Sequence, residues 1–259
     1  MKIKIIALLT LVTLIGCKDN SKEMSHEHLV LATVWFQQSP EAKALYEQGF
    51  NIAMERVAEF TKEKSEKPYA IITDIDETIL DNSPFQGKAI FDGKDYSSDF
   101  WNEWTSKGCA KALPGAVSFS KFCDSIGVQL VYLSNRQTNE LEATMRNMDS
   151  LGFAFVTPDN FLLKVDKSGK EERRLKVSEK YNVIMLMGDN LNDFAEVFEN
   201  RGDDWGAAIV EQYKKEFGRR FIVFPNPMYG DWEKNLYNNQ RDLNWKEKFK
   251  LRRSKLIGY

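Results

Sequence analysis

Four short apolar runs, separated by stretches with helical periodicity, organise the middle of the chain. The runs cover residues 69–73, 128–133, 183–187 and 221–224, and each is followed by polar residues. Apolar runs of this length without alternation are typical of parallel strands that are buried on both faces. Helical spacing is found between them, at residues 115–126, 139–151, 170–180 and 193–200. The alternation predicts an α/β fold with an open parallel sheet flanked by helices.

A long helix is predicted upstream of the first strand, from Ser39 to about residue 62. Ser39 is a good cap, Pro40 suits the first turn, and Glu41 lies near the positive end of the helix dipole. Residues 82–111 interrupt the alternation of strands and helices just after the first strand. This segment is rich in aromatic residues and glycine. This insertion would overhang the carboxyl edge of the sheet, and together with the N-terminal helices it would form a smaller cap.

The first residues have the pattern of an export signal. Lys2 and Lys4 precede an apolar run over residues 5–15, which is shorter than the roughly 20 residues that span a bilayer. The run ends in Leu-Ile-Gly-Cys, which resembles the lipobox of bacterial lipoproteins, so we expect residues 1–17 to be a signal peptide ending at a lipidated Cys17. The alternative, an ordinary cleaved signal peptide, lacks its small-x-small cleavage pattern. Residues 18–27 are polar and charged, and we expect residues 18–30 to form a flexible tether.

Composition removes several function classes. The chain has 259 residues, of which 42% are hydrophobic, and 36 Lys and Arg against 38 Asp and Glu leave a net charge of −2. This balance offers no general attraction to nucleic acid polymers. His26 and His28 are the two histidines of the chain and lie in the expected tether, where we predict that they are solvated. A catalytic imidazole and a histidine-rich zinc site are therefore not expected.

Two features outside the central pattern leave alternatives open. Cys109 and Cys123 could form a disulfide in an exported protein, but the helical spacing of Cys123 with apolar neighbours favours two free thiols. Residues 231–259 are predicted to form a helical extension that ends in a run of Lys and Arg. A solvated helix face is the simpler interpretation of this run, and a patch that binds lipid headgroups is the alternative.

Chemically useful side chains follow three of the predicted strands. Asp74 and Asp76 come after the first strand, Ser134 and Arg136 after the second, and Asp189 after the third. Ligands of open parallel sheets bind beyond the carboxyl ends of the strands, so these groups should meet. Crowded carboxylates resist ionisation unless a cation joins them. Oxygen ligands without histidine favour a hard ion, and we expect Mg2+.

Two segments carry a specific resemblance. Residues 74–82 (DIDETILDN) and 188–194 (GDNLNDF), with Ser134 and a lysine between them, resemble the four ordered motifs of the haloacid dehalogenase superfamily of phosphotransferases. More narrowly, the two segments are similar to the signatures of class C acid phosphatases, a group that includes the outer-membrane lipoprotein e type of 5'-nucleotidase. The similarity spans about residues 34–232 and continues in residues 113–116, 133–136, 166–170 and 224–232.

The resemblance implies a phosphomonoesterase with a defined set of roles. Asp74 would attack phosphorus and form an aspartyl-phosphate, and Asp76 would act as acid and then as base. Mg2+ would be held by the Asp74 side chain, the backbone carbonyl of Asp76, and Asp189, with Asp193 behind them. Ser134 and a lysine would contact the phosphoryl oxygens. That lysine is expected to be Lys170, with Lys164 and Lys167 as alternatives.

Substrate and setting follow from the same resemblance. Phe85, Trp101 and Tyr229 are candidates to flank a nucleobase, which implies nucleoside 5'-monophosphates or nicotinamide mononucleotide as substrates. The expected organisation is a cap segment at residues 31–66, a haloacid dehalogenase-like core at 67–230 with the insertion 82–111, and the extension 231–259. The resemblance also implies an exported lipoprotein of the outer membrane and a homodimer. Two other readings are a surface lipoprotein that binds without turnover, and a phosphotransferase with an alcohol acceptor.

Overall fold

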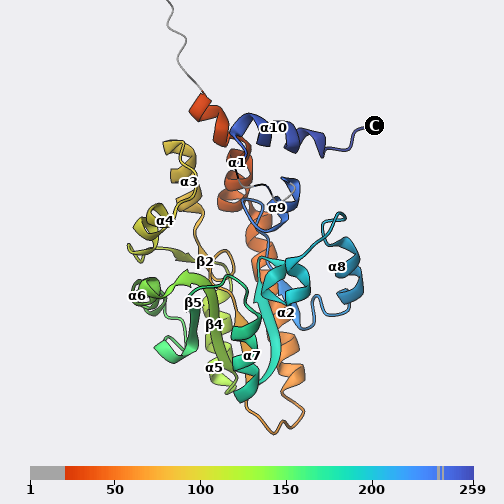
Figure 1. The fold of residues 1–259 in the computed structure, drawn as a ribbon. Helices are drawn as coiled ribbons and strands as arrows, with labels where there is room; N and C mark the ends of the chain where they lie inside the picture. The colour runs from red at the N-terminus through yellow and green to blue at the C-terminus, as the bar shows by residue number, and fades with distance from the viewer. Residues whose placement is uncertain (1–20, 238–239, 241) are drawn as a thin grey trace, which may run out of the picture.

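The centre of the structure is a five-stranded parallel sheet, which confirms the α/β prediction (Figure 1). The computed structural model describes residues 21–237, 240 and 242–259. The strand order is β5-β4-β1-β6-β7, and every neighbouring pair is parallel. The strands are β1 (Tyr69–Thr73), β4 (Gln129–Gln137), β5 (Phe161–Lys164), β6 (Asn182–Gly188) and β7 (Phe221–Val223). The sequence pattern did not predict β5.

Strand β1 lies in the middle of the sheet because its side chains are apolar on both faces. Ile71 belongs to the larger core cluster, which also contains Phe50 and Phe119. Ala70 and Ile72 point the other way and pack with Val177. All of β1 after Tyr69 is buried. A strand with two buried faces must have a helical layer on each side.

Helices from both halves of the chain form these layers. α2 (Pro40–Phe60) and α5 (Ala116–Ser125) contribute to the larger core, and α7 (Glu171–Lys180) covers the opposite face through Val177. α6 (Leu141–Leu151) contributes Met148 to the larger core, and α8 (Ala207–Tyr213) packs on a small separate cluster with Phe198 and Phe221. The Ser39 cap is confirmed, since its hydroxyl accepts a hydrogen bond from the Ala42 backbone N–H at 3.0 Å. The packing of α2 on the sheet corrects the prediction that all of residues 31–66 belong to the cap.

The cap consists of α1 and the insertion. α1 (Ser21–Gln38) packs against α3 (Ser83–Asp92), and α4 (Ser98–Thr105) follows. A short antiparallel pair, β2 (Leu80–Asp81) and β3 (Lys111–Ala112), closes the base of the insertion. Phe85, Ala89 and Phe100 form its own small core, with Trp101 and Trp104 packed against them. The cap therefore lies above the carboxyl edge of the sheet (Figure 1).

Three other predictions are wrong. Residues 21–30 are helical instead of forming a tether, and His26 is buried, with Nε2 3.3 Å from an Asp95 carboxylate oxygen, instead of solvated. His26 is buried where α1 packs against the insertion. The polar composition of residues 21–27 gave no sign of this packing. The expected helix at residues 193–200 is replaced by two short 3-10 turns, η3 (Leu191–Asp193) and η4 (Glu196–Glu199). The segment predicted to be a signal peptide, residues 1–17 with Cys17, lies outside the described residues.

The remaining elements are short or peripheral. They are η1 (Thr138–Glu140), η2 (Pro158–Asn160), α9 (Trp232–Leu236) and α10 (Trp245–Ser254). Cys109 is exposed and Cys123 is buried, and both are free thiols, as predicted. Within the part of the chain that the structure describes, no helix combines the length and the apolar character needed to cross a bilayer.

Candidate active site

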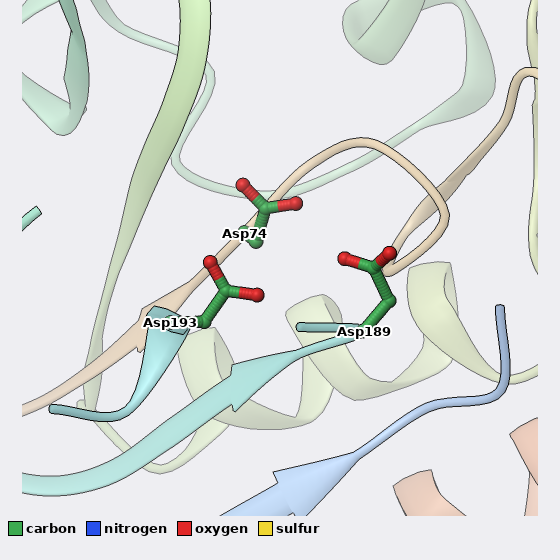
Figure 2. Close-up of side chains that lie close together, drawn as sticks. All are labelled: Asp74, Asp189 and Asp193. Carbon is green, nitrogen blue, oxygen red and sulfur yellow. The ribbon is translucent and has the colours of Figure 1, made fainter. Parts of the chain in front are cut away.

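The pairing of β1 with β6 brings the acidic residues together. Thr73, the last residue of β1, pairs with Met187 of β6, so Asp74 follows the end of β1 next to Gly188, the last residue of β6. The Asp74 backbone N–H donates to the Met187 carbonyl at 2.9 Å and extends this alignment by one residue. Figure 2 shows the carboxylates of Asp74, Asp189 and Asp193 turned toward one another. One oxygen from each lies within 4.8 Å of the others.

Asp193 reaches this cluster because residue 188 is a glycine. A Cβ atom on Gly188 would lie 2.2 Å from Asp193 Oδ2 and 2.4 Å from Asp193 Cβ. Both distances are much shorter than van der Waals contact, so a larger residue would clash. The missing side chain lets the η3 turn fold back over the end of β6. Asp193 Oδ2 also accepts the Asn190 backbone N–H at 3.0 Å, which closes the turn. The turn therefore holds the Asp193 carboxylate in place.

Lys170 supplies the positive charge of the cluster. Its Nζ lies 2.5 Å from Asp74 Oδ1 and 2.6 Å from Asp193 Oδ1, and the side chain is buried. Although burial lowers its pKa, Asp193 and Asp74 raise it by more, so the ammonium form is favoured. Lys167 is exposed and pairs with Glu172, while Lys164 ends β5. Of the three candidate lysines, Lys170 is the one that contacts the aspartates.

Asp76 is bound by a different set of side chains. Arg136 donates to Asp76 Oδ1 from Nη2 at 2.7 Å and from Nε at 2.9 Å, and Asn82 Nδ2 donates at 2.8 Å. The Asp76 carboxylate is thus held by Arg136 and Asn82 and is not part of the cluster of Asp74, Asp189 and Asp193. Sequence reasoning noted Arg136 but gave it no role. The available signal was spacing, since Arg136 and Ser134 share one face of β4.

Ser134 contacts Asp76 and is fully buried. Its hydroxyl donates to Asp76 Oδ2 at 3.2 Å and accepts the Arg136 backbone N–H at 3.1 Å. The wall of the neighbouring cavity is formed at this point by Asn135 and Arg136. Ser134 therefore lies within the site, and its hydroxyl group helps to hold the Asp76 carboxylate in place.

The acidic cluster fits a hard divalent cation. Burial raises the pKa of Asp74 to about 7, with Asp193 and Asp76 adding to the effect and Lys170 opposing it. Burial also raises the pKa of Asp189, followed by the charges of Asp193 and Asp74. Three carboxylates face one ammonium group, so the cluster carries an excess of negative charge. A cation with oxygen ligands would offset that excess and restore the ionised form of the carboxylates.

A cavity of about 380 Å3 connects the acidic cluster to the cap. Its floor includes Asp74, Asp76, Lys170 and Asp189. Four aromatic rings also line it, those of Phe85, Tyr96 and Trp101 from the insertion and that of Tyr229 from the segment after β7. The cavity therefore contains all three of the aromatic residues that the resemblance implied, together with Tyr96, which the resemblance did not single out. A larger cavity of about 620 Å3 lies beside α7 and β6, away from the aspartate cluster.

The fold and the site define a class of enzyme, and comparison with known proteins agrees. Residues 19–232 match the family model described as HAD superfamily, subfamily IIIB (acid phosphatase). The chain belongs to this family of phosphoric monoester hydrolases. It is similar to the class C acid phosphatase from Bacillus anthracis, with 40% identity, a TM-score of 0.86, and coverage of 92% of this chain and 99% of that one. A second structure of that enzyme, described with tungstate bound, gives a TM-score of 0.87 at 39% identity.

The chain is less similar to several plant proteins. The stem 31 kDa glycoprotein of Glycine max is 25% identical over 197 residues, which cover 73% of this chain and 67% of the relative. Acid phosphatase 1 of Solanum lycopersicum is 26% identical over 163 residues, covering 61% and 57%. The chain thus spans between half and two thirds of the length of these two relatives. Membership of the family favours the enzyme over the alternative of a surface lipoprotein that binds without turnover.

Proposed function

We propose that this protein is a Mg2+-dependent acid phosphatase that works through an aspartyl-phosphate. The contact of Lys170 with both Asp74 and Asp193, beside Asp189 and at the floor of the cavity, carries this proposal. Asp74 is the one member of the cluster that directly follows the central strand and shares the cavity floor with Asp76. The similarity to a structure described with tungstate bound supports the proposal, because tungstate is a tetrahedral oxyanion like phosphate.

In the first step an Asp74 carboxylate oxygen forms a bond to phosphorus while the bond from phosphorus to the leaving oxygen breaks. Asp76 gives its proton to that oxygen, and an alcohol departs. In the second step Asp76 takes a proton from water, whose oxygen attacks phosphorus and returns Asp74 and phosphate. Arg136, Asn82 and Ser134 hold the Asp76 carboxylate in one orientation for both transfers.

Lys170 balances charge during both steps. Its ammonium group is already desolvated and positioned between Asp74 and Asp193, so little reorganisation is needed when phosphoryl oxygens enter. We assign the metal to Asp74, the Asp76 carbonyl and Asp189. A Mg2+ ion held there would supply further positive charge to offset the charge of the carboxylate nucleophile and of the phosphoryl oxygens.

Metal removal tests this assignment. Treatment with a chelator should lower kcat for p-nitrophenyl phosphate about 100-fold or more, since metal stabilisation of a phosphoryl transition state is worth several kcal/mol. Addition of Mg2+ should restore turnover. The measurement is steady-state hydrolysis before and after dialysis, with circular dichroism to show that the fold persists. Full activity in a folded, metal-free sample would contradict the proposal.

The aromatic side of the cavity indicates the leaving group. Phe85 and Trp101 meet edge to face, with ring centroids 5.1 Å apart at 87°, so a flat base could stack on one ring while the other supports it. Tyr229 lines the same cavity. We propose that Trp101 and Tyr229 flank the base of a nucleoside 5'-monophosphate, or the nicotinamide of the corresponding mononucleotide, with Phe85 behind them.

Loss of one ring should affect nucleotides selectively. Trp101→Ala and Tyr229→Ala are each expected to lower kcat/KM for adenosine 5'-monophosphate about 5- to 150-fold, because stacking of one base is worth roughly 1–3 kcal/mol. Butyl phosphate should change less than about twofold. Phe91→Ala is the matched control, since Phe91 belongs to the same cap and is 91% exposed. Equal losses for the nucleotide and butyl phosphate would exclude base stacking.

The setting of the enzyme is a separate proposal. The lipobox at residues 14–17 supports an exported lipoprotein, held by acyl chains on Cys17 to the outer membrane. Cells that express the chain with radiolabelled palmitate should label the wild-type protein and leave Cys17→Ser unlabelled. Equal labelling of both forms would place any lipid elsewhere.

A further inference from the structure

The end of the chain concentrates positive charge on one helix and the tail that follows it. Residues 245–259 contain six Lys or Arg and one Glu, a net charge of +5, whereas the whole chain carries −2. The other residues therefore sum to −7. α10 is a well-formed helix, because the Asn244 side chain accepts the backbone N–H groups of Lys246 and Glu247 at 3.0 Å and 3.2 Å. The charge is thus presented on a fixed scaffold.

α10 has two distinct faces. Trp245, Lys248, Leu251 and Arg252 are half-buried, and Arg252 Nη2 lies 3.6 Å from Glu233, so this face packs on the protein. The outward face repeats at helical spacing and consists of Lys246, Phe249, Lys250 and Arg253. Phe249 is 49% exposed and lies beneath the Arg253 guanidinium. Among the described residues, no ion pair involves the three cations of this outward face.

The residues that follow α10 include exposed apolar side chains. Leu256 is 76% exposed and Ile257 is fully exposed. A row of cations with an exposed phenylalanine, extended by exposed aliphatic side chains, is the pattern of a helix that lies in the interface of an anionic bilayer. Exposed apolar side chains such as Phe249, Leu256 and Ile257 gain nothing from contact with water, whereas a bilayer interface would bury them.

α10 lies beside the start of α1. The first turns of α1 and the first turns of α10 line one cavity of about 600 Å3, through His26 and Leu29 on one side and Trp245 and Lys248 on the other. Figure 1 shows α10 and the beginning of α1 at the same end of the molecule. α1 begins at Ser21, four residues after Cys17, and four residues reach at most about 14 Å. A lipid on Cys17 would therefore hold α10 close to the bilayer.

We propose that the outward face of α10 docks on an anionic bilayer. The choice of a bilayer over another polyanion rests on the proposed anchor at Cys17, while the charge and the exposed apolar side chains belong to α10 itself. The acidic remainder of the chain is repelled by the same surface, so the two contributions together orient the molecule. The cavity beside α10 and the catalytic cavity share Phe85, Gln86, Tyr96 and Tyr229. Docking would thus turn the catalytic end toward the bilayer.

Vesicle sedimentation tests the proposal without the anchor. A chain that begins at Lys18 retains every described helix and strand and has no Cys17 to acylate. It should partition onto vesicles of phosphatidylcholine with 30% phosphatidylglycerol about a hundredfold better than onto phosphatidylcholine alone, at roughly 1 kcal/mol for each basic residue at the surface. The preference should weaken as salt is added.

Matched charge reversals separate α10 from net charge. The triple variant Lys246→Glu, Lys250→Glu, Arg253→Glu should lose about a hundredfold or more of the partitioning onto anionic vesicles. The control, Lys64→Glu, Lys176→Glu, Lys180→Glu, makes the same change in net charge at exposed positions away from α10 and should bind nearly as wild type does. Both should keep wild-type turnover of p-nitrophenyl phosphate.

Three results would overturn the proposal. They are equal binding to the two kinds of vesicle, equal losses in the two triple variants, and tighter binding of a single-stranded RNA than of anionic vesicles. Palmitate labelling of Cys17 is measured independently, so a failed anchor and a failed α10 surface give different results.

Discussion

Asp74→Asn should abolish turnover while the fold remains intact. The amide has nearly the shape of the carboxylate but cannot serve as the nucleophile, so kcat for p-nitrophenyl phosphate should fall on the order of 10^4-fold or more. Lys170 keeps Asp193 as a charge partner at 2.6 Å, so it is not left as an isolated buried charge. The measurement is steady-state hydrolysis, with trapping of a covalent phosphoenzyme from wild type but not from the variant.

Stability provides a second readout of the same substitution. Burial raises the pKa of Asp74 to about 7 in the folded protein, against about 4 in an unfolded chain. The folded state then binds more protons between these values, so Asp74 makes the metal-free protein less stable as pH rises from about 4 to 7. Asp74→Asn removes this loss, and its Tm at pH 8 without metal should exceed that of wild type.

The surface substitution Asp149→Asn is the matched control for both measurements. Asp149 is exposed on α6, so its replacement should leave kcat and Tm close to wild type. Normal turnover by Asp74→Asn, or a phosphoenzyme that still forms in that variant, would remove Asp74 from the reaction.

Asp76→Asn should produce the second largest loss, and its size should depend on the leaving group. Transfer of a proton by a positioned carboxyl is typically worth about 10^2–10^4-fold. Butyl phosphate, whose alkoxide is a poor leaving group, should lose the full factor in kcat/KM. p-Nitrophenyl phosphate releases a stable phenolate and needs no proton, so its first step should lose much less. The two substrates are compared in the same buffer, with burst kinetics to isolate the first step.

The same substitution also changes the partner of a buried cation. Arg136 makes its charged contacts with Asp76, and Asn82 and Thr144 remain as neutral partners after the exchange. Loss of the counter-charge should lower the free energy of unfolding, by up to the roughly 3–5 kcal/mol seen when a buried pair loses one member. Arg136→Lys should keep the positive charge but lose the forked pair of hydrogen bonds to Asp76. It should therefore retain only part of the wild-type activity. A uniform loss for both substrates of Asp76→Asn would indicate a purely structural role.

The local sequence pattern predicted the structure correctly where the contacts that determine it are close in sequence. The cap at Ser39 depends on Ala42, three residues away, and it is present as predicted. The apolar strands were recognised because burial on both faces leaves a continuous apolar run, and the aspartates that follow β1 and β6 were selected because strand ends point to one edge. Pattern failed for residues 193–200, where the η3 turn bends back over Gly188 instead of continuing as a helix.

The sequence by itself determined the parallel α/β sheet and the acidic, oxygen-bearing residues at its carboxyl edge. These follow from composition and period, which are local properties of the chain. Only the tertiary structure decided that Lys170 bridges Asp74 and Asp193, that Arg136 holds Asp76, and that the basic helix α10 lies beside the start of α1. Those contacts join segments 23 to 96 residues apart at the site, and far more for α10. Their partners are chosen by the packing of the sheet and the cap, which no local pattern contains.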